Sequence, residues 1–117
     1  MEVRSKIWLE IDGNAVFGSG RRALLESIDK LGSINKAAGD INISYRKALS
    51  YIQSMEKRLG VTLVERRAGG KNGGGAVLTK KAREFLGKYE KLESGVNALL
   101  DLRFLEIFGN GKRKKYV

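Results

Sequence analysis

The chain has 117 residues, a typical length for one domain, and 42% of them are hydrophobic, enough for a compact core of modest size. It contains no cysteine, which excludes disulfides and thiolate metal sites. It also contains no histidine, the commonest metal ligand and general base. We therefore expect neither an enzyme nor a metalloprotein. The formal net charge is +10, which predicts a polyanionic partner. We find neither a signal peptide nor an apolar run long enough to span a membrane, and we therefore predict a cytoplasmic protein.

Two short strands are predicted at the start of the chain. Ile7, Leu9 and Ile11 occupy alternate positions in residues 6–11, which is the pattern of a half-buried strand. Residues 12–14 read Asp-Gly-Asn, a signal for a tight turn, so residues 15–17 can return as the second strand of a hairpin. The Gly-Ser-Gly sequence at residues 18–20 ends that strand.

Three helices joined by short turns are predicted next. Apolar residues recur at helical spacing from residue 21 onwards, and Gly32 is placed to end the first helix. Ser33 and Ser44 are suitable N-caps for the second and third helices, and Asn42 between them tolerates the left-handed conformation that a tight turn needs. Gly60 is placed to end the third helix. The inward-facing residues predicted for the three helices are Leu24, Leu25, Ile28, Leu31, Ile34, Ala37, Ala38, Ile41, Ala48, Ile52, Met55 and Leu59.

A second hairpin and a long helix complete the predicted elements. Residues 61–67 and 76–78 have the composition of strands, and the glycine-rich residues 69–75 form the loop between them. Thr79 can cap a final helix that extends to about Phe108. The remaining residues, 109–117, are predicted to be a basic, disordered tail.

An apolar stripe on the final helix predicts a homodimer interface. Its residues recur at spacings of 4, 3, 4 and 3, as in a short coiled-coil seam. A helix of this length overhangs so small a domain, and residues 92–111 are net acidic, so we prefer packing against a second copy to packing within the chain. The predicted interface residues are Phe85, Tyr89, Leu92, Val96 and Leu99.

The order of these elements predicts a fold class. The second and third helices with their short turn form a helix-turn-helix, and the hairpin that follows can act as a wing. We therefore predict a mainly α (α+β) fold: a winged helix-turn-helix with an N-terminal β-hairpin and a long C-terminal dimerisation helix. Residues 1–78 would form the hairpin and the DNA-binding domain, residues 79–108 the dimerisation helix, and residues 109–117 the tail.

The third helix presents basic and polar side chains on the face opposite its apolar stripe. Arginine can read guanine and glutamine can read adenine in the major groove, whereas hydroxyl groups can bond phosphate. We predict base or near-base contacts by Arg46, Lys47, Ser50 and Gln53. We predict contacts to the DNA backbone by Ser44, Tyr45, Tyr51, Arg66, Arg67, Lys71, Thr79 and Lys80. Taken alone, this helix also fits a solvated amphipathic helix; its place in the whole pattern favours DNA.

The glycine-rich loop has three interpretations. A nucleotide-binding P-loop needs Gly-Lys-Ser or Gly-Lys-Thr directly before a helix, but here Gly70 and Lys71 are followed by Asn72, more glycines and a strand. A plain hairpin loop and a DNA-contacting wing both remain, and the neighbouring basic residues favour the wing. Thr79 and the lysines after it leave two interpretations open, a phosphate site at a helix N-terminus and an ordinary helix cap.

The positive charge is concentrated in residues 44–91 and in the tail Lys112–Lys115, whereas residues 1–12 and 92–111 are net acidic. This distribution predicts a polyanion footprint on one part of the fold. We expect a sequence-specific regulator of transcription that binds double-stranded DNA in the cytoplasm, at the nucleoid, without catalysis. Two alternatives stay open: a chromatin-like architectural protein that coats DNA without reading its sequence, and a protein-interaction domain that binds no DNA.

Several segments resemble a known family. Residues 32–38, 43–44 and 55–66 are similar to the DNA-binding domain of LysR-type regulators. Residues 43–48, 63–66 and 69–79 are more closely similar to the N-terminal domain of ModE-type molybdate-responsive regulators, and the glycine-rich wing running into Ala-Val-Leu-Thr is the most specific part of the match. The resemblance covers roughly residues 6–108.

The resemblance implies a winged helix-turn-helix that dimerises through its terminal helices and reads a palindromic operator with the helix after Ser44. The two recognition helices of such a dimer lie about 34 Å apart, one turn of DNA. ModE-type regulators also have C-terminal molybdate-binding domains, which this sequence lacks, so we predict no cofactor and do not extend molybdate or tungstate sensing to this chain. A stand-alone DNA-binding form, a separate effector-sensing protein and a truncated chain stay open.

Overall fold

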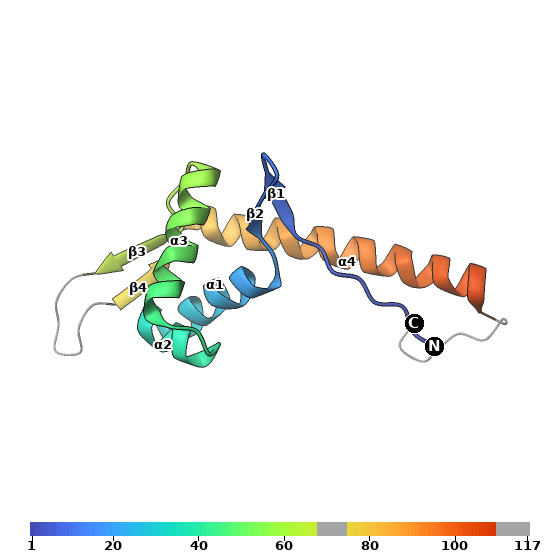
Figure 1. Ribbon diagram of the computed structural model, residues 1–117, viewed down its shortest axis with the longest axis horizontal. Helices are drawn as coiled ribbons and strands as arrows, with labels where there is room; N and C mark the ends of the chain where they lie inside the picture. The colour runs from blue at the N-terminus through green and yellow to red at the C-terminus, as the bar shows by residue number, and fades with distance from the viewer. Residues whose placement is uncertain (68–74, 110–117) are drawn as a thin grey trace. The chain divides into compact units, whose positions relative to one another are not determined.

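The computed structural model describes residues 1–67 and 75–109 (Figure 1). The elements are β1 (Leu9–Ile11), β2 (Asn14–Phe17), α1 (Ser19–Leu31), α2 (Ile34–Asp40), α3 (Tyr45–Leu59), β3 (Val64–Arg67), β4 (Gly75–Leu78) and α4 (Lys80–Phe108). Their type and order confirm the predicted winged helix-turn-helix with an N-terminal hairpin and a long last helix. The predicted loop with Lys71 and the predicted tail with Lys112–Lys115 fall largely or wholly outside the described residues.

The chain divides into two compact units, residues 8–86 and residues 1–7 together with the chain from residue 87. The continuous helix α4 therefore contributes its first two turns to the unit of residues 8–86. The assignment of all of residues 79–108 to dimerisation stays a prediction. Among the described residues, no helix combines the length and the apolar character that crossing a bilayer requires.

The N-terminal hairpin is shorter than the alternation of residues 6–11 predicts. β1 begins at Leu9, because Leu9 pairs with Phe17, the last residue of β2, and no further residue of β2 is available for pairing. Asp12 and Gly13 form the turn with φ angles of 51° and 79°, a left-handed pair that suits a two-residue hairpin. Phe17 is fully buried and packs edge-to-face on Phe85 of α4, with ring centroids 4.8 Å apart.

The helix ends confirm the predicted capping residues. Gly32 and Gly60 adopt left-handed conformations, with φ angles of 69° and 71°, where a side chain would be strained. Ser33 accepts a hydrogen bond from the Lys36 backbone N–H at 3.1 Å, and Ser44 accepts one from the Lys47 N–H at 3.0 Å. These local interactions set the end of α1, the start of α2 and both ends of α3.

The core of the unit of residues 8–86 lies among the three helices and the second hairpin. Its fully buried side chains include Phe17, Leu24, Leu25, Ile28, Ala37, Ala48, Met55 and Leu63. The predicted inward stripes are confirmed except at their margins: Leu31, in the last turn of α1, is 36% exposed, and Ile41 and Leu59 are half-buried. A buried hydroxyl, Ser27 Oγ on α1, donates to Asp40 Oδ2 on α2 at 2.7 Å and joins the two helices.

Candidate nucleic-acid interface

The exposed face of α3 is the centre of the candidate interface. Ala48, Ile52 and Met55 are buried, so the packing of α3 on the rest of the unit leaves its opposite face free. Of the residues predicted to contact DNA from α3 and its cap, all but one are exposed: Ser44, Tyr45, Arg46, Lys47, Ser50 and Gln53. The exception, Tyr51, is half-buried. The structure thus brings the predicted helix residues together on one surface.

The turn before α3 has the geometry of a tight helix-turn-helix. Asn42 adopts a φ angle of 59°, the left-handed conformation expected from the sequence. The Ile43 N–H donates to the Ala38 carbonyl at 2.9 Å, and the Asn42 N–H donates to the Gly39 carbonyl at 3.2 Å. These bonds close the chain on itself after α2, so that α3 starts directly at its Ser44 cap.

The β3–β4 hairpin presents two exposed arginines. The strands pair antiparallel, with Arg66 opposite Ala76 and Arg67 opposite Gly75. Ala76 and Leu78 are buried, whereas both arginines are exposed. Lys71 lies outside the described residues.

The start of β3 is tied to the end of α3 by a residue that sequence reasoning missed. Glu56 Oε2 accepts hydrogen bonds from the backbone N–H groups of Leu63, at 2.8 Å, and Val64, at 3.2 Å. The other side of the hairpin is held by the Ala76 N–H, which donates to the Gly32 carbonyl at 2.9 Å. An acidic side chain in an otherwise basic helix was the available signal, but its backbone partners could not be read from the sequence.

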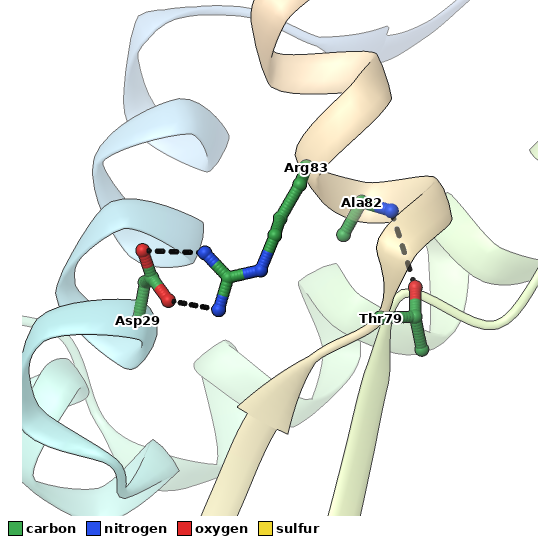
Figure 2. A network of polar contacts seen from close by, with 4 residues as sticks. All are labelled: Asp29, Thr79, Ala82 and Arg83. Carbon is green, nitrogen blue, oxygen red and sulfur yellow. Dashed lines mark hydrogen bonds and ion pairs between the residues drawn. The ribbon is translucent and has the colours of Figure 1, made fainter.

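Thr79 has the role of a helix cap in this structure. Its hydroxyl donates to the Thr62 carbonyl at 2.7 Å. The same oxygen accepts from the Ala82 N–H at 3.1 Å (Figure 2). Its own backbone N–H donates to the Leu63 carbonyl at 2.9 Å. Both donors of Thr79 are therefore used within the fold, which favours the capping interpretation over the phosphate-binding one. Lys80, beside it, is exposed.

Some basic residues are paired within the fold and others are not. Arg83 of α4 makes two contacts with the Asp29 carboxylate of α1, at 3.1 and 2.7 Å (Figure 2). Over residues 1–67 and 75–109, Arg46, Arg66 and Arg67 have no carboxylate or hydrogen-bond partner. The unpaired arginines lie on α3 and β3, where an external anion can reach them. Residues 1–67 and 75–109 hold no group of three acidic side chains suited to a metal ion.

Arg21 was not predicted to belong to the interface. It lies in the first turn of α1, and its guanidinium carbon is 4.6 Å from the centroid of the Tyr51 ring on α3. Lys47 Nζ lies 5.7 Å from the centroid of the same ring. Both distances are in the range of cation–π attraction. Residues 21 and 51 are too far apart in sequence for helical periodicity to relate them.

The five residues of the predicted dimer seam fall into two groups. Tyr89 is only 2% exposed, and its hydroxyl donates to the Ile7 carbonyl at 2.6 Å. Phe85 is half-buried against Phe17. Leu92, Val96 and Leu99 are 45%, 39% and 60% exposed. The first two side chains thus have partners within the chain, and the last three are open to another molecule.

Comparison with known proteins identifies the family. The model of the lysR family of bacterial regulatory helix-turn-helix proteins matches residues 22–83, which include most of α1 and all of α2, α3 and the wing strands. The chain belongs to this LysR family. Two solved structures share the fold of this LysR-family chain. The "CbnR_DBD-DNA complex" has a TM-score of 0.53 at 20% identity and covers 72% of this chain and 91% of that one. ArgP from Mycobacterium tuberculosis has a TM-score of 0.50 at 22% identity, over 70% and 30% of the two chains.

Curated relatives confirm the resemblance to ModE-type regulators. The LysR-family chain is 41% identical over 86 residues to the molybdenum-pterin-binding protein MopB of Rhodobacter capsulatus. The matched residues make up 74% of this chain and 32% of MopB. It is 44% identical over 73 residues to the transcriptional regulator ModE of Haemophilus influenzae, which is 62% of this chain and 29% of ModE. It is 42% identical over 78 residues to the DNA-binding transcriptional dual regulator ModE of Escherichia coli K12, over 66% and 30% of the two chains. The chain thus spans about a third of the length of these relatives.

Proposed function

We propose that this chain is a sequence-specific regulator of transcription that binds double-stranded DNA as a homodimer. The main support is the exposed basic face of α3, where Arg46 has no partner in the described part of the chain, while Ala48, Ile52 and Met55 on the opposite face are buried. A helix with one buried stripe and one free cationic face has the properties that major-groove recognition requires. The unpaired Arg66 and Arg67 supply charge for the DNA backbone on the neighbouring hairpin.

The proposed contacts divide by chemistry. Contacts to base edges are assigned to residues of α3 whose side chains can donate to or accept from bases: Arg46, Lys47, Ser50 and Gln53. Contacts to phosphates are assigned to hydroxyl and basic groups around them: Ser44, Tyr45, Tyr51, Arg66, Arg67, Lys71 and Lys80. Ser44 uses its oxygen to accept from Lys47, which leaves its hydroxyl proton free to donate to a phosphate. Thr79 is omitted because its donors are engaged within the fold.

The dimer is proposed to form through the exposed apolar side chains of α4. Leu92, Val96 and Leu99 continue the helical spacing of the buried Tyr89, and their exposure leaves apolar area that a second copy can bury. A symmetric dimer would place two copies of α3 against two half-sites of one operator.

The experiment that tests the function is selection of bound sequences from a random duplex pool, followed by competition between the selected duplex and random duplex. A specific regulator retains a preference of at least about a thousandfold. Enrichment of a palindromic sequence supports the proposal, and binding with no preference supports the architectural alternative, which the net charge of +10 favours. No binding at low salt supports the protein-interaction alternative.

The names of the relatives add one arm to this selection. MopB is described as molybdenum-pterin-binding, but this chain matches about a third of its length. We propose that effector sensing, if present, belongs to another domain or a separate protein. Selection with and without molybdate or tungstate should therefore recover the same sequences at the same affinity.

A further inference from the structure

Two cations share one aromatic ring at the edge of the α3 face. Arg21 comes from the first turn of α1, and its guanidinium carbon lies 4.6 Å from the centroid of the Tyr51 ring. Lys47, one turn before Tyr51 on α3, places Nζ 5.7 Å from the same centroid. The ring face attracts each cation, but the two cations repel each other. The cluster is therefore stabilised further by any anion that binds between or beside them.

No acidic side chain in the described part of the chain fills this role. Over residues 1–67 and 75–109, neither Arg21 nor Lys47 has a carboxylate partner, although Arg22 on the same helix is paired with Glu26 at 3.4 Å. Arg21 Nε is buried and has no hydrogen-bond partner. A buried unsatisfied donor costs about 1–3 kcal/mol, so the folded chain tolerates a cost at Arg21 that a plain surface arginine does not have.

We propose that Arg21, together with Lys47, forms a phosphate-binding site for the DNA backbone beside the recognition helix, and that Tyr51 is the positioning residue that orients the guanidinium. This inference rests on the proposed function and adds a residue of α1 to it. A guanidinium held flat against a ring presents its terminal N–H groups in a fixed plane, which suits two parallel bonds to phosphate oxygens. Lys47 is thereby assigned to the backbone instead of a base.

The position of Arg21 favours a phosphate over a base edge. When α3 lies in the major groove, the helices packed behind it face the strands that border the groove, and those strands present phosphates. Arg21 belongs to α1, so its reach is toward the border and not toward the groove floor. Its contribution to binding should then be independent of DNA sequence.

The test is the salt dependence of binding to a mixed-sequence duplex, measured by fluorescence anisotropy with the full chain. Removing one phosphate contact reduces the slope of log K against log salt concentration by about 0.9. Arg21→Ala should show this reduction. Lys30→Ala is the matched control, because it removes the same charge from an exposed position at the other end of α1, and it should leave the slope unchanged.

Two substitutions at Tyr51 separate the ring from its hydroxyl. Tyr51→Phe keeps the platform for Arg21 and should retain the slope of the wild type. Tyr51→Leu removes the platform and should weaken binding at every salt concentration. Arg21→Lys keeps the charge but lacks the planar donors of the guanidinium. It should therefore retain the slope of the wild type but bind DNA with lower affinity. Thermal melting of each variant shows whether it is folded. If Arg21→Ala does not fold, the affinity of Arg21→Lys compared with that of the wild type tests the site instead.

The outcomes distinguish the site from the function. A wild-type chain that binds no duplex at low salt overturns the proposed function and the phosphate site with it. A wild type that binds, with an Arg21→Ala slope equal to that of the wild type, overturns the site alone and leaves Arg21 as a structural stacking residue. Equal slope reductions in Arg21→Ala and Lys30→Ala also overturn it, because net charge would then explain both.

Discussion

Glu56, near the end of α3, accepts a hydrogen bond from the Leu63 N–H at 2.8 Å and so ties the recognition helix to the start of the wing. The same carboxylate oxygen accepts from the Val64 N–H at 3.2 Å. Leu63 and Val64 are both buried, so water cannot readily take the place of the Glu56 carboxylate as acceptor for their backbone N–H groups. The one acidic side chain of α3 thus sets where the wing begins relative to the helix.

Substitution of Glu56 by Ala should destabilise the fold. Two buried N–H groups would lose their acceptor, and an unsatisfied buried donor costs about 1–3 kcal/mol. Urea denaturation measures the change in the free energy of unfolding. Glu56→Gln retains an acceptor oxygen and should lose less. Glu65→Gln, at an exposed position of β3, is the control, and equal stabilities of Glu56→Ala and the wild type would contradict the proposed anchor.

Substitution of Arg46 by Ala should reduce affinity for the selected operator and relax base preference. A base contact of this kind is worth about 1–3 kcal/mol, and its loss is confined to sequences that contain the recognised base. Arg66→Ala should instead weaken binding to all duplexes alike, because a phosphate contact carries no sequence information. Competition binding with the operator and with random duplex measures both. Unchanged operator affinity of Arg46→Ala would reject its assignment to a base.

Substitution of Val96 by Glu should shift the chain from dimer to monomer. The change places a charge among Leu92, Leu99 and their proposed partners in the second copy, where desolvation of a carboxylate is costly. Sedimentation velocity measures the oligomeric state. Ala98→Glu introduces the same charge at an exposed position of α4 outside the stripe and should leave the dimer intact. A wild type that sediments as a monomer at all concentrations rules out the proposed interface.

The ion pair between Arg83 and Asp29 should contribute little, despite its two short contacts. The side chains are 56% and 41% exposed, so solvent screens their attraction, and exposed pairs of this kind are worth about 0.2–1 kcal/mol. A double-mutant cycle with Arg83→Ala and Asp29→Ala measures the coupling. High salt should diminish it, and a coupling well above this range would show that the pair is more desolvated than its exposure indicates.

Much of the fold could be predicted because it depends on local chemistry. The caps at Ser33 and Ser44, the left-handed Asn42 and the glycine ends of α1 and α3 each involve residues within a few positions of one another. Helical spacing then separated the buried stripe of α3 from its basic face. The assignment of individual side chains to bases, phosphates and the dimer seam remains a prediction.

The amino-acid sequence by itself determined the order of elements, the helix boundaries and the polar face of α3, because hydrogen bonding along the chain and hydrophobic periodicity act over one or two turns. Only the tertiary structure decided three contacts. The Tyr89 hydroxyl is hydrogen-bonded to the Ile7 carbonyl, 82 residues away, Arg21 lies over the Tyr51 ring, and Glu56 accepts a hydrogen bond from the Leu63 N–H at the start of the wing. Those contacts join residues whose separation in sequence has no fixed period, so their proximity arises from how the helices pack and not from any pattern along the chain.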